Sequence, residues 1–201
     1  LLIGMLLITA ATMGGKNLYF RGDYKVFFDD DNPQLTAFEH MQSTFNKNEN
    51  AAIIIAPKSG NVFSKETLTL IKNMTDQAWL TPNSSRVDSI TNYQHTWAQE
   101  DDLIVEDLVP DLETIDQQTI ARAREVALKE PNLVKRMVSE KGHVAVINIT
   151  VQLPDADTPK TALDTSIAVN DITGFIIKMT EEYKAQYPDH DFYHTGIVFM
   201  S

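Results

Sequence analysis

Apolar positions along this chain change spacing most clearly between residues 27 and 56. Asn32 and Pro33 follow three aspartates at 29–31, and they suit the N-cap and first position of a helix. An apolar stripe at helical spacing follows, made of Leu35, Phe38, Met41 and Phe45 with Gln42 as a polar exception. It predicts an amphipathic helix with this stripe inward. The run at 51–56, AAIIIA, predicts a buried central strand.

The same two spacings recur along the rest of the chain. Ser64 predicts the N-cap of a helix whose inner face carries Leu68, Ile71, Met74 and Ala78. Residues 84–92 predict a weaker strand, and the strict alternation at 143–153 predicts a clear one. A long helix begins near Leu163, with Val169, Ile172, Ile176, Met179 and Tyr183 on one stripe. Residues 191–200 predict a last strand, broken at Gly196.

Residues 93–142 interrupt this order and are acidic and irregular, with one apolar island at 103–105. Asp116 predicts the N-cap of a helix, and a further short helix is expected beyond Pro131 to carry Leu133, Val134, Met137 and Val138. About fifty residues of this kind cannot bury a convincing core alone. We therefore interpret 93–142 as a helical insertion.

Without the insertion, the order of elements is βαβ followed by βαβ. This order predicts an α+β fold, a ferredoxin-like split βαβ two-layer sandwich with its helices on one face of an antiparallel sheet. The other face then needs cover, from the insertion or from a neighbouring subdomain.

Composition narrows the function classes. The chain has 201 residues, 43% of them hydrophobic, which suits a folded domain. Its net charge of −11, without a long Lys/Arg cluster, argues against nucleic acid as a partner. It has no cysteine, which excludes disulfides and thiolate chemistry.

The first thirteen residues are uncharged and rich in Leu, Ile and Met. They are too short to span a bilayer, so residues 1–15 are interpreted as the outer half of a transmembrane helix, with a buried core helix as the alternative. Residues 16–201 then form one domain. Because the chain also stops within an apolar run, it resembles a loop between membrane helices.

The search for chemistry yields no assigned catalytic, cofactor-binding or metal residue. Asp189, His190, Asp191 and His194 include ligand types that suit zinc, but the two histidines are expected about 13 Å apart along a strand. They are better explained as polar residues at the top of that strand. The aspartates at 29–31 lack the spacing of an EF-hand and are interpreted as a solvated turn.

Two further polar groups fall in the insertion. An acidic cluster, expected to be a solvated face, consists of Glu100, Asp101, Asp102, Glu106 and Asp107. His95 beside Trp97 is expected to pack within a loop rather than to touch a ligand.

Residues 27–56, with FF-x-x-x-N-P-x-L-x-A-F-E before the III strand, resemble the start of the first large extracytoplasmic loop in bacterial exporters of the resistance-nodulation-division (RND) superfamily, MMPL-like branch. Residues 61–75 and 84–93 continue the resemblance in order. It implies a non-enzymatic porter domain of a proton-driven exporter in the bacterial inner membrane, facing the periplasm. It also implies lipids or other hydrophobic substrates, a second porter loop and membrane helices as partners, and a possible homo-oligomer. The proton-relay residues of that family lie in membrane helices outside this chain.

Two other classes remain open. One is a membrane-tethered ferredoxin-like module that binds a ligand or acts as a sensor. The other is a membrane-anchored hydrolase that uses the Asp/His cluster at 189–194.

Overall fold

The computed structural model describes residues 27–29, 32–45, 49–99, 102–111, 113, 115–154 and 159–200. The fold is α+β. Its helices are α2 (Pro33–Phe45), α3 (Lys65–Ala78), α4 (Gln117–Lys129) and α5 (Pro159–Gln186), with a 3-10 turn η3 (Ile197–Phe199). Its strands are β1 (Glu49–Pro57), β2 (Ser84–Asp88), β3 (Gln94–Gln99), β4 (Asp102–Asp107), β5 (Ala145–Val151) and β6 (His190–Thr195).

The chain divides into two compact units. The larger unit contains residues 48–152 and 171–200, and the smaller includes α2 and the first part of α5. The larger unit holds a four-stranded sheet in the order β2-β5-β1-β6, in which every neighbouring pair is antiparallel. The predicted central strand is confirmed, because β1 lies between β5 and β6 and both Ile53 and Ile55 are fully buried.

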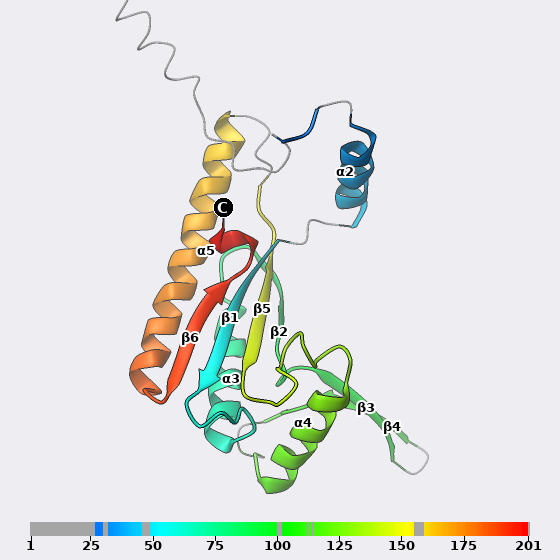
Figure 1. Cartoon of the computed structure of the whole chain (residues 1–201), viewed down its shortest axis with the longest axis vertical. Coiled ribbons are helices and arrows are strands. Elements are labelled where there is room, and N and C mark those ends of the chain that lie inside the picture. The colour runs from blue at the N-terminus through cyan, green and yellow to red at the C-terminus, as the bar shows by residue number, and fades with distance from the viewer. Residues whose placement is uncertain are drawn as a thin grey trace, which may run out of the picture. The chain divides into compact units, whose positions relative to one another are not determined.

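One face of this sheet packs against α3 and α5. Ile53 lies opposite Ile147 of β5 and His194 of β6, so these side chains share a face. On that face His194 reaches a hydroxyl of α5, and His190 reaches one of α3. Both helices therefore cover the same side, and Figure 1 shows α3 behind the strands.

The predicted helix faces are largely confirmed. Ser64 caps α3 by accepting a hydrogen bond from Thr67 N, and Leu68, Ile71, Met74 and Ala78 are all fully buried. In α5, Ile172, Ile176 and Met179 are buried, although the helix begins at Pro159 rather than near Leu163. Asp116 caps α4 as expected, and its side chain accepts from Thr119 N.

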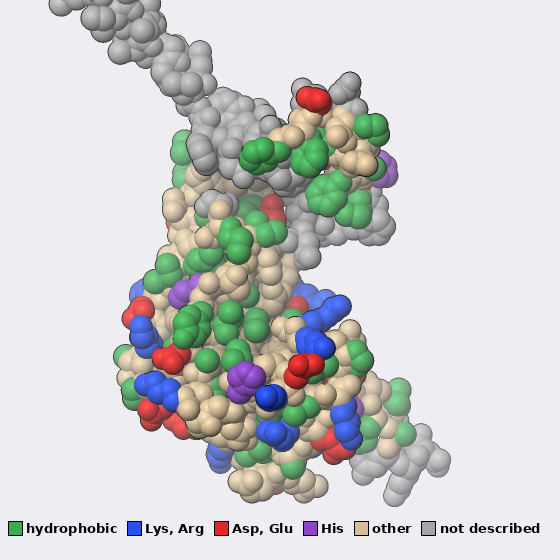
Figure 2. Space-filling model, in the orientation of Figure 1, with side chains coloured by type: hydrophobic (Ala, Val, Ile, Leu, Met, Phe, Trp, Pro, Cys, Tyr) green, Lys and Arg blue, Asp and Glu red, His purple; other side chains and the backbone are tan. Residues whose placement is uncertain are grey.

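The other face of the sheet stays partly open. Ile54 and Val146 form a cross-strand pair on this face and are half-buried, while Tyr193, opposite Ile54 on β6, is 56% exposed. Figure 2 shows hydrophobic side chains gathered over β6, β1 and β5 on the side turned toward the viewer. The insertion does not cover these side chains in the described residues.

In the smaller unit, the helix predicted at 32–45 is present as α2, and Asn32 Oδ1 accepts from Gln34 N and Leu35 N. Its stripe is only partly inward, contrary to expectation: Leu35 is 9% exposed, but Phe38 is 40% and Met41 48% exposed. The apolar segment at 1–13 lies outside the described residues. Within the described part of the chain, no helix has the length and apolar character needed to cross a bilayer.

Three predictions about secondary structure were wrong. The insertion is not mainly helical, because its first part is a two-stranded sheet of β3 and β4. Residues 133–138 form turns, with isolated bridges at Val134 and Val138, rather than a helix. The last strand breaks at Gly196, as predicted, where φ is 109°, but residues 197–199 beyond the break form the 3-10 turn η3 rather than a strand.

Candidate functional site

The Asp/His segment at 189–194 does not assemble into one constellation. His190 and His194 lie on the helix-covered face of β6, whereas Asp191, opposite Ala56, points to the open face. Among the described residues no group of three His, Asp or Glu side chains is placed to hold a metal ion. The structure instead gives each histidine a separate hydroxyl partner.

These two partners come from different helices. His190 Nε2 lies 2.9 Å from Thr67 Oγ1 of α3, and His194 Nε2 lies 2.9 Å from Thr180 Oγ1 of α5. Tyr187 packs edge-on against His190, and Phe199 stacks on His194. The histidines thus join the edge strand β6 to both helices.

The hydrogen-bond network assigns the tautomer of the His194 ring. Thr180 donates to Ile176 O, so its oxygen must accept a proton from His194 Nε2. Thr67 Oγ1, which also accepts from Ser64 Oγ, is the hydrogen-bond partner of His190 Nε2. His190 Nδ1 has no hydrogen-bond partner among the described atoms.

Burial lowers the pKa of His190 below its ordinary value, and the carboxylates of Glu66 and Asp189 only partly oppose this. Burial likewise lowers the pKa of His194, against the carboxylate of Glu181. Both rings are therefore neutral near pH 7 and act as packing and hydrogen-bonding groups.

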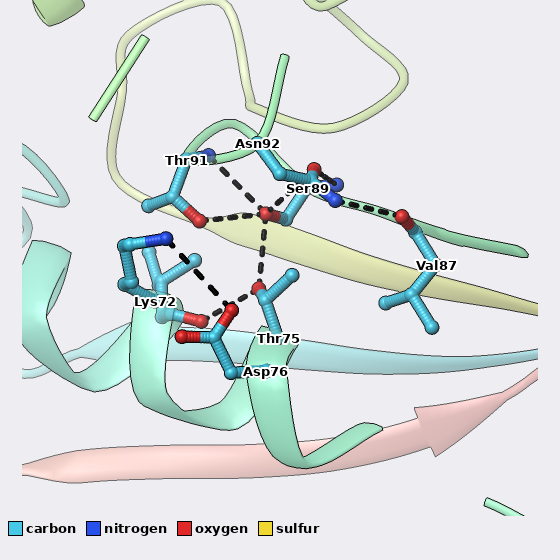
Figure 3. Close-up of polar contacts among 8 residues, drawn as sticks. Lys72, Thr75, Asp76, Val87, Ser89, Thr91 and Asn92 are labelled. Carbon is cyan, nitrogen blue, oxygen red and sulfur yellow. Dashed lines mark hydrogen bonds and ion pairs between the residues drawn. The ribbon is translucent and has the colours of Figure 1, made fainter. Parts of the chain in front are cut away.

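A buried hydroxyl cluster lies between α3 and the turn that follows β2 (Figure 3). Ser89 Oγ is 3.0 Å from Thr75 Oγ1 and 2.8 Å from Thr91 Oγ1. These three side chains are at most 2% exposed. Asn92 extends the cluster, since its amide accepts from Ser89 N and donates to Val87 O. The cluster therefore cross-links α3 to the end of β2.

This cluster also fixes the base of the β3–β4 hairpin, residues 94–107, which we call the arm. Leu108 N donates to Tyr93 O, and Val109 N donates to Thr91 O. Leu108 and Val109 are 1% and 0% exposed. The backbone hydrogen bonds of the arm thus continue to Thr91, a member of the buried hydroxyl cluster. The arm extends past α4, away from the four-stranded sheet (Figure 1).

One face of the arm packs against α4 through Arg122. Its guanidinium carbon lies 5.1 Å from the centroid of the Trp97 ring, and Arg122 Nη1 lies 2.9 Å from Glu106 Oε1. His95 stacks on Trp97 with ring centroids 5.5 Å apart, but both residues lie on strand β3 rather than in the loop that the sequence predicted.

The opposite face of the arm is open to solvent. Cross-strand pairing places Thr96 opposite Val105 and Ala98 opposite Leu103, and all four residues are exposed. Leu103 is 72% and Val105 52% exposed. An arm with a rigid base and an exposed apolar face is suited to binding another surface.

Sequence reasoning missed the arm, although some signals were present. The island at 103–105 contains the strand-forming residues Ile104 and Val105. Acidic residues at 100–102 separate it from residues 94–99, which form the other strand of the arm. Of the predicted acidic cluster, Asp102, Glu106 and Asp107 lie on β4, and only Glu106 turns toward Arg122. Glu100 and Asp101 lie outside the described residues, as do Asp30 and Asp31 of the predicted solvated turn.

No model of a known protein family matches this chain, and no curated protein matches it.

Proposed function

We propose that this chain is the porter-type domain of an RND/MMPL-like exporter, facing the periplasm from the bacterial inner membrane. In this proposal the domain is not an enzyme. It forms part of a path along which a lipid or another hydrophobic compound moves while a proton gradient drives the rest of the protein.

The order of the strands supports this proposal. Two βαβ units, β1-α3-β2 and β5-α5-β6, interleave as β2-β5-β1-β6 with all neighbours antiparallel. This is the order that a ferredoxin-like split βαβ sandwich has. The segments that carry the RND resemblance fall in sequence on α2, β1, α3 and β2.

The observation that carries most weight is the half-open sheet. The helix-covered face holds fully buried side chains such as Ile53 and Ile147, whereas the opposite face presents Ile54, Val146 and Tyr193. A partly exposed face with apolar side chains of this kind is suited to interaction with another surface. A second porter subdomain opposed to this face would form an apolar cleft for a hydrophobic substrate.

Single-cysteine labelling tests this proposal, because the chain has no native cysteine. Tyr193→Cys places a thiol on the open face, and Lys129→Cys places one on the exposed side of α4 as a matched control. Each variant is made in the protein that carries this chain, reconstituted into vesicles with a proton gradient and a fluorescent lipid. Labelling Tyr193→Cys with a bulky maleimide should slow lipid movement at least about tenfold, since it obstructs the cleft, and labelling Lys129→Cys should not.

The same thiols test orientation. A membrane-impermeant maleimide added to intact spheroplasts should label Lys129→Cys if the domain faces the periplasm. Lipid movement that ignores the proton gradient, or labelling only after lysis, would overturn the proposal. A protein that binds a ligand on the open face but moves none would favour the sensor module.

A further inference from the structure

The arm presents an apolar surface that no described residue of its own chain covers. Leu103 and Val105 are 72% and 52% exposed, and they lie beside Ala98 and Thr96 on the same face. Side chains on the two faces of a hairpin point in opposite directions. Because Trp97 and Glu106 bind Arg122 of α4 from the other face, the apolar face is directed away from α4.

The charged residues of the arm are all negative. Residues 94–107 contain five acidic residues and no Lys or Arg. The complementary surface must therefore be basic and partly apolar, because like charges would oppose docking.

Such a surface is present elsewhere on this chain. Residues 122–141 hold six of its 17 Lys and Arg residues against three Glu. Within this segment, Arg136 and Lys141 are exposed and form no ion pair with any carboxylate that the structure describes. Met137 lies between them and is half-buried. We call residues 133–142 the basic turn.

The basic turn is also held rigidly. Val62 N donates to Gly142 O, Val146 N donates to Met137 O, and Ser139 Oγ accepts from the backbone of His143 and Val144. Lys135 pairs with Glu140 at 2.9 Å across the turn. A preordered surface loses little conformational freedom when it is bound.

We propose that the apolar face of the arm docks on the basic turn of a second copy of this chain. Leu103 and Val105 cover Met137, and Asp107, which shares their face of the arm, approaches Arg136 and Lys141. The contact joins two different surfaces, so two copies exchange arms reciprocally or several copies close into a ring. This inference is independent of the proposed function.

Sedimentation velocity of the full chain tests the proposal, with the same non-ionic detergent in every sample so that the apolar first residues do not associate. The chain should self-associate with rising concentration at about 50 mM salt and dissociate at about 500 mM, because surface charges are screened at higher ionic strength. Leu103→Ser with Val105→Ser should weaken association by at least about tenfold. Leu80→Ser, which removes a side chain 71% exposed elsewhere, should leave it unchanged.

A charge exchange gives the sharpest result. Asp107→Lys should strongly weaken self-association, as should Arg136→Glu with Lys141→Glu. Mixing these two variants should restore association to within about threefold of the original, because the reversed arm then meets a reversed basic turn. Lys178→Glu on α5 is the control for a change in net charge alone. Circular dichroism confirms that each variant is folded.

A chain that stays monomeric at low salt would overturn the proposal. Association that survives both reversals, or that mixing does not restore, would also overturn it. A disulfide between Val105→Cys in one copy and Met137→Cys in another would support the docking directly, since each thiol is the sole one in its chain.

Discussion

Strands β1 and β4 contain similar apolar triplets, at 53–55 and 103–105, yet the structure treats them differently. In β1, Ile53 and Ile55 are fully buried between two strands and under two helices. In β4, Leu103 and Val105 remain exposed, because the arm has only two strands and contacts α4 through its other face. An apolar triplet therefore specifies a strand, while the number of strands and helices packed around it decides whether its side chains become part of the core.

Truncation of each triplet should give the largest difference. Ile53→Ala leaves a cavity in the sheet core and should lower the free energy of unfolding by about 2–5 kcal/mol. Leu103→Ala should change it by less than about 0.5 kcal/mol, because that side chain is already in water. Urea denaturation at low protein concentration measures both, and equal losses would contradict the comparison.

Two glycines distinguish a packed end of the sheet from a free turn. An alanine Cβ at Gly196, where φ is 109°, would lie 2.5 Å from Asn50 O, whereas nothing lies within 4 Å at Gly60. Gly196→Ala should lower stability by at least about 1–3 kcal/mol. Gly60→Ala should cost about 1 kcal/mol, from its left-handed φ alone. Thermal unfolding compares the two variants, and a smaller shift for Gly196→Ala would be inconsistent with this close approach.

The base of the arm is polar where the sheet core is apolar. Ser89→Ala removes the hydroxyl partner of the buried Thr91 Oγ1 and Thr91 N, while Thr75 keeps its bond to Ile71 O, and should cost about 1–3 kcal/mol. It should also speed hydrogen exchange at Leu108 N and Val109 N. Ser85→Ala removes an exposed hydroxyl that donates to Thr150 O, and it serves as the control. If hydrogen exchange at Leu108 N and Val109 N is unchanged in Ser89→Ala, the hydroxyl cluster does not stabilise the base of the arm.

Acid should weaken the sheet core through β6. The pKa values of His190 and His194 are lowered by burial, so the unfolded chain binds protons that the folded chain does not. This contribution to stability is complete above the unfolded pKa of about 6.5. It is lost as pH falls below that value toward the lowered pKa of each ring. Urea midpoints should therefore fall from pH 7 to pH 5, and fall less in His194→Gln.

His143→Gln, which removes an exposed imidazole, is the control for that slope. A midpoint independent of pH in the parent chain would contradict the assignment of neutral rings.

A small effect is also expected where the arm meets α4. Arg122→Gln removes both the Trp97 contact and the Glu106 ion pair, yet should cost less than about 1 kcal/mol because these groups are only half-buried. Hydrogen exchange within residues 94–107 should nevertheless increase. Lys129→Gln, which breaks the exposed Lys129–Glu125 pair, should leave that exchange unchanged.

Much of the four-stranded sheet could be predicted from sequence because its signals are local and repeated. The run at 51–56, the cap at Ser64 and the alternation at 145–151 each require only periodicity and one capping side chain. Boundaries were less accurate. Residues 89–92 were expected in a strand, but Ser89 and Asn92 bind the backbone of a turn instead.

The arm and its base could not be predicted in the same way. The hydroxyl cluster joins Thr75 of α3 to Ser89 and Thr91 in the turn after β2. Hydrophobic periodicity describes residues within one element, so it cannot predict a contact between two elements. The partners of His190 and His194 likewise lie on other elements, Thr67 of α3 and Thr180 of α5, so the sequence could place these histidines on one strand but could not name what they bind. The apolar stripe of α2 is only partly covered, since helical spacing predicts a stripe but does not supply the surface that buries it.

The irregular pairing of β2 has a consequence for solubility. Between Ser84 and Arg86 its register against β5 shifts, so the outermost strand on that side bends out of line. A strand from another molecule that paired with this edge would face irregularly spaced backbone amides and the charged side chains of Arg86 and Asp88. The irregular pairing of β2 therefore disfavours edge-to-edge aggregation at this side of the sheet.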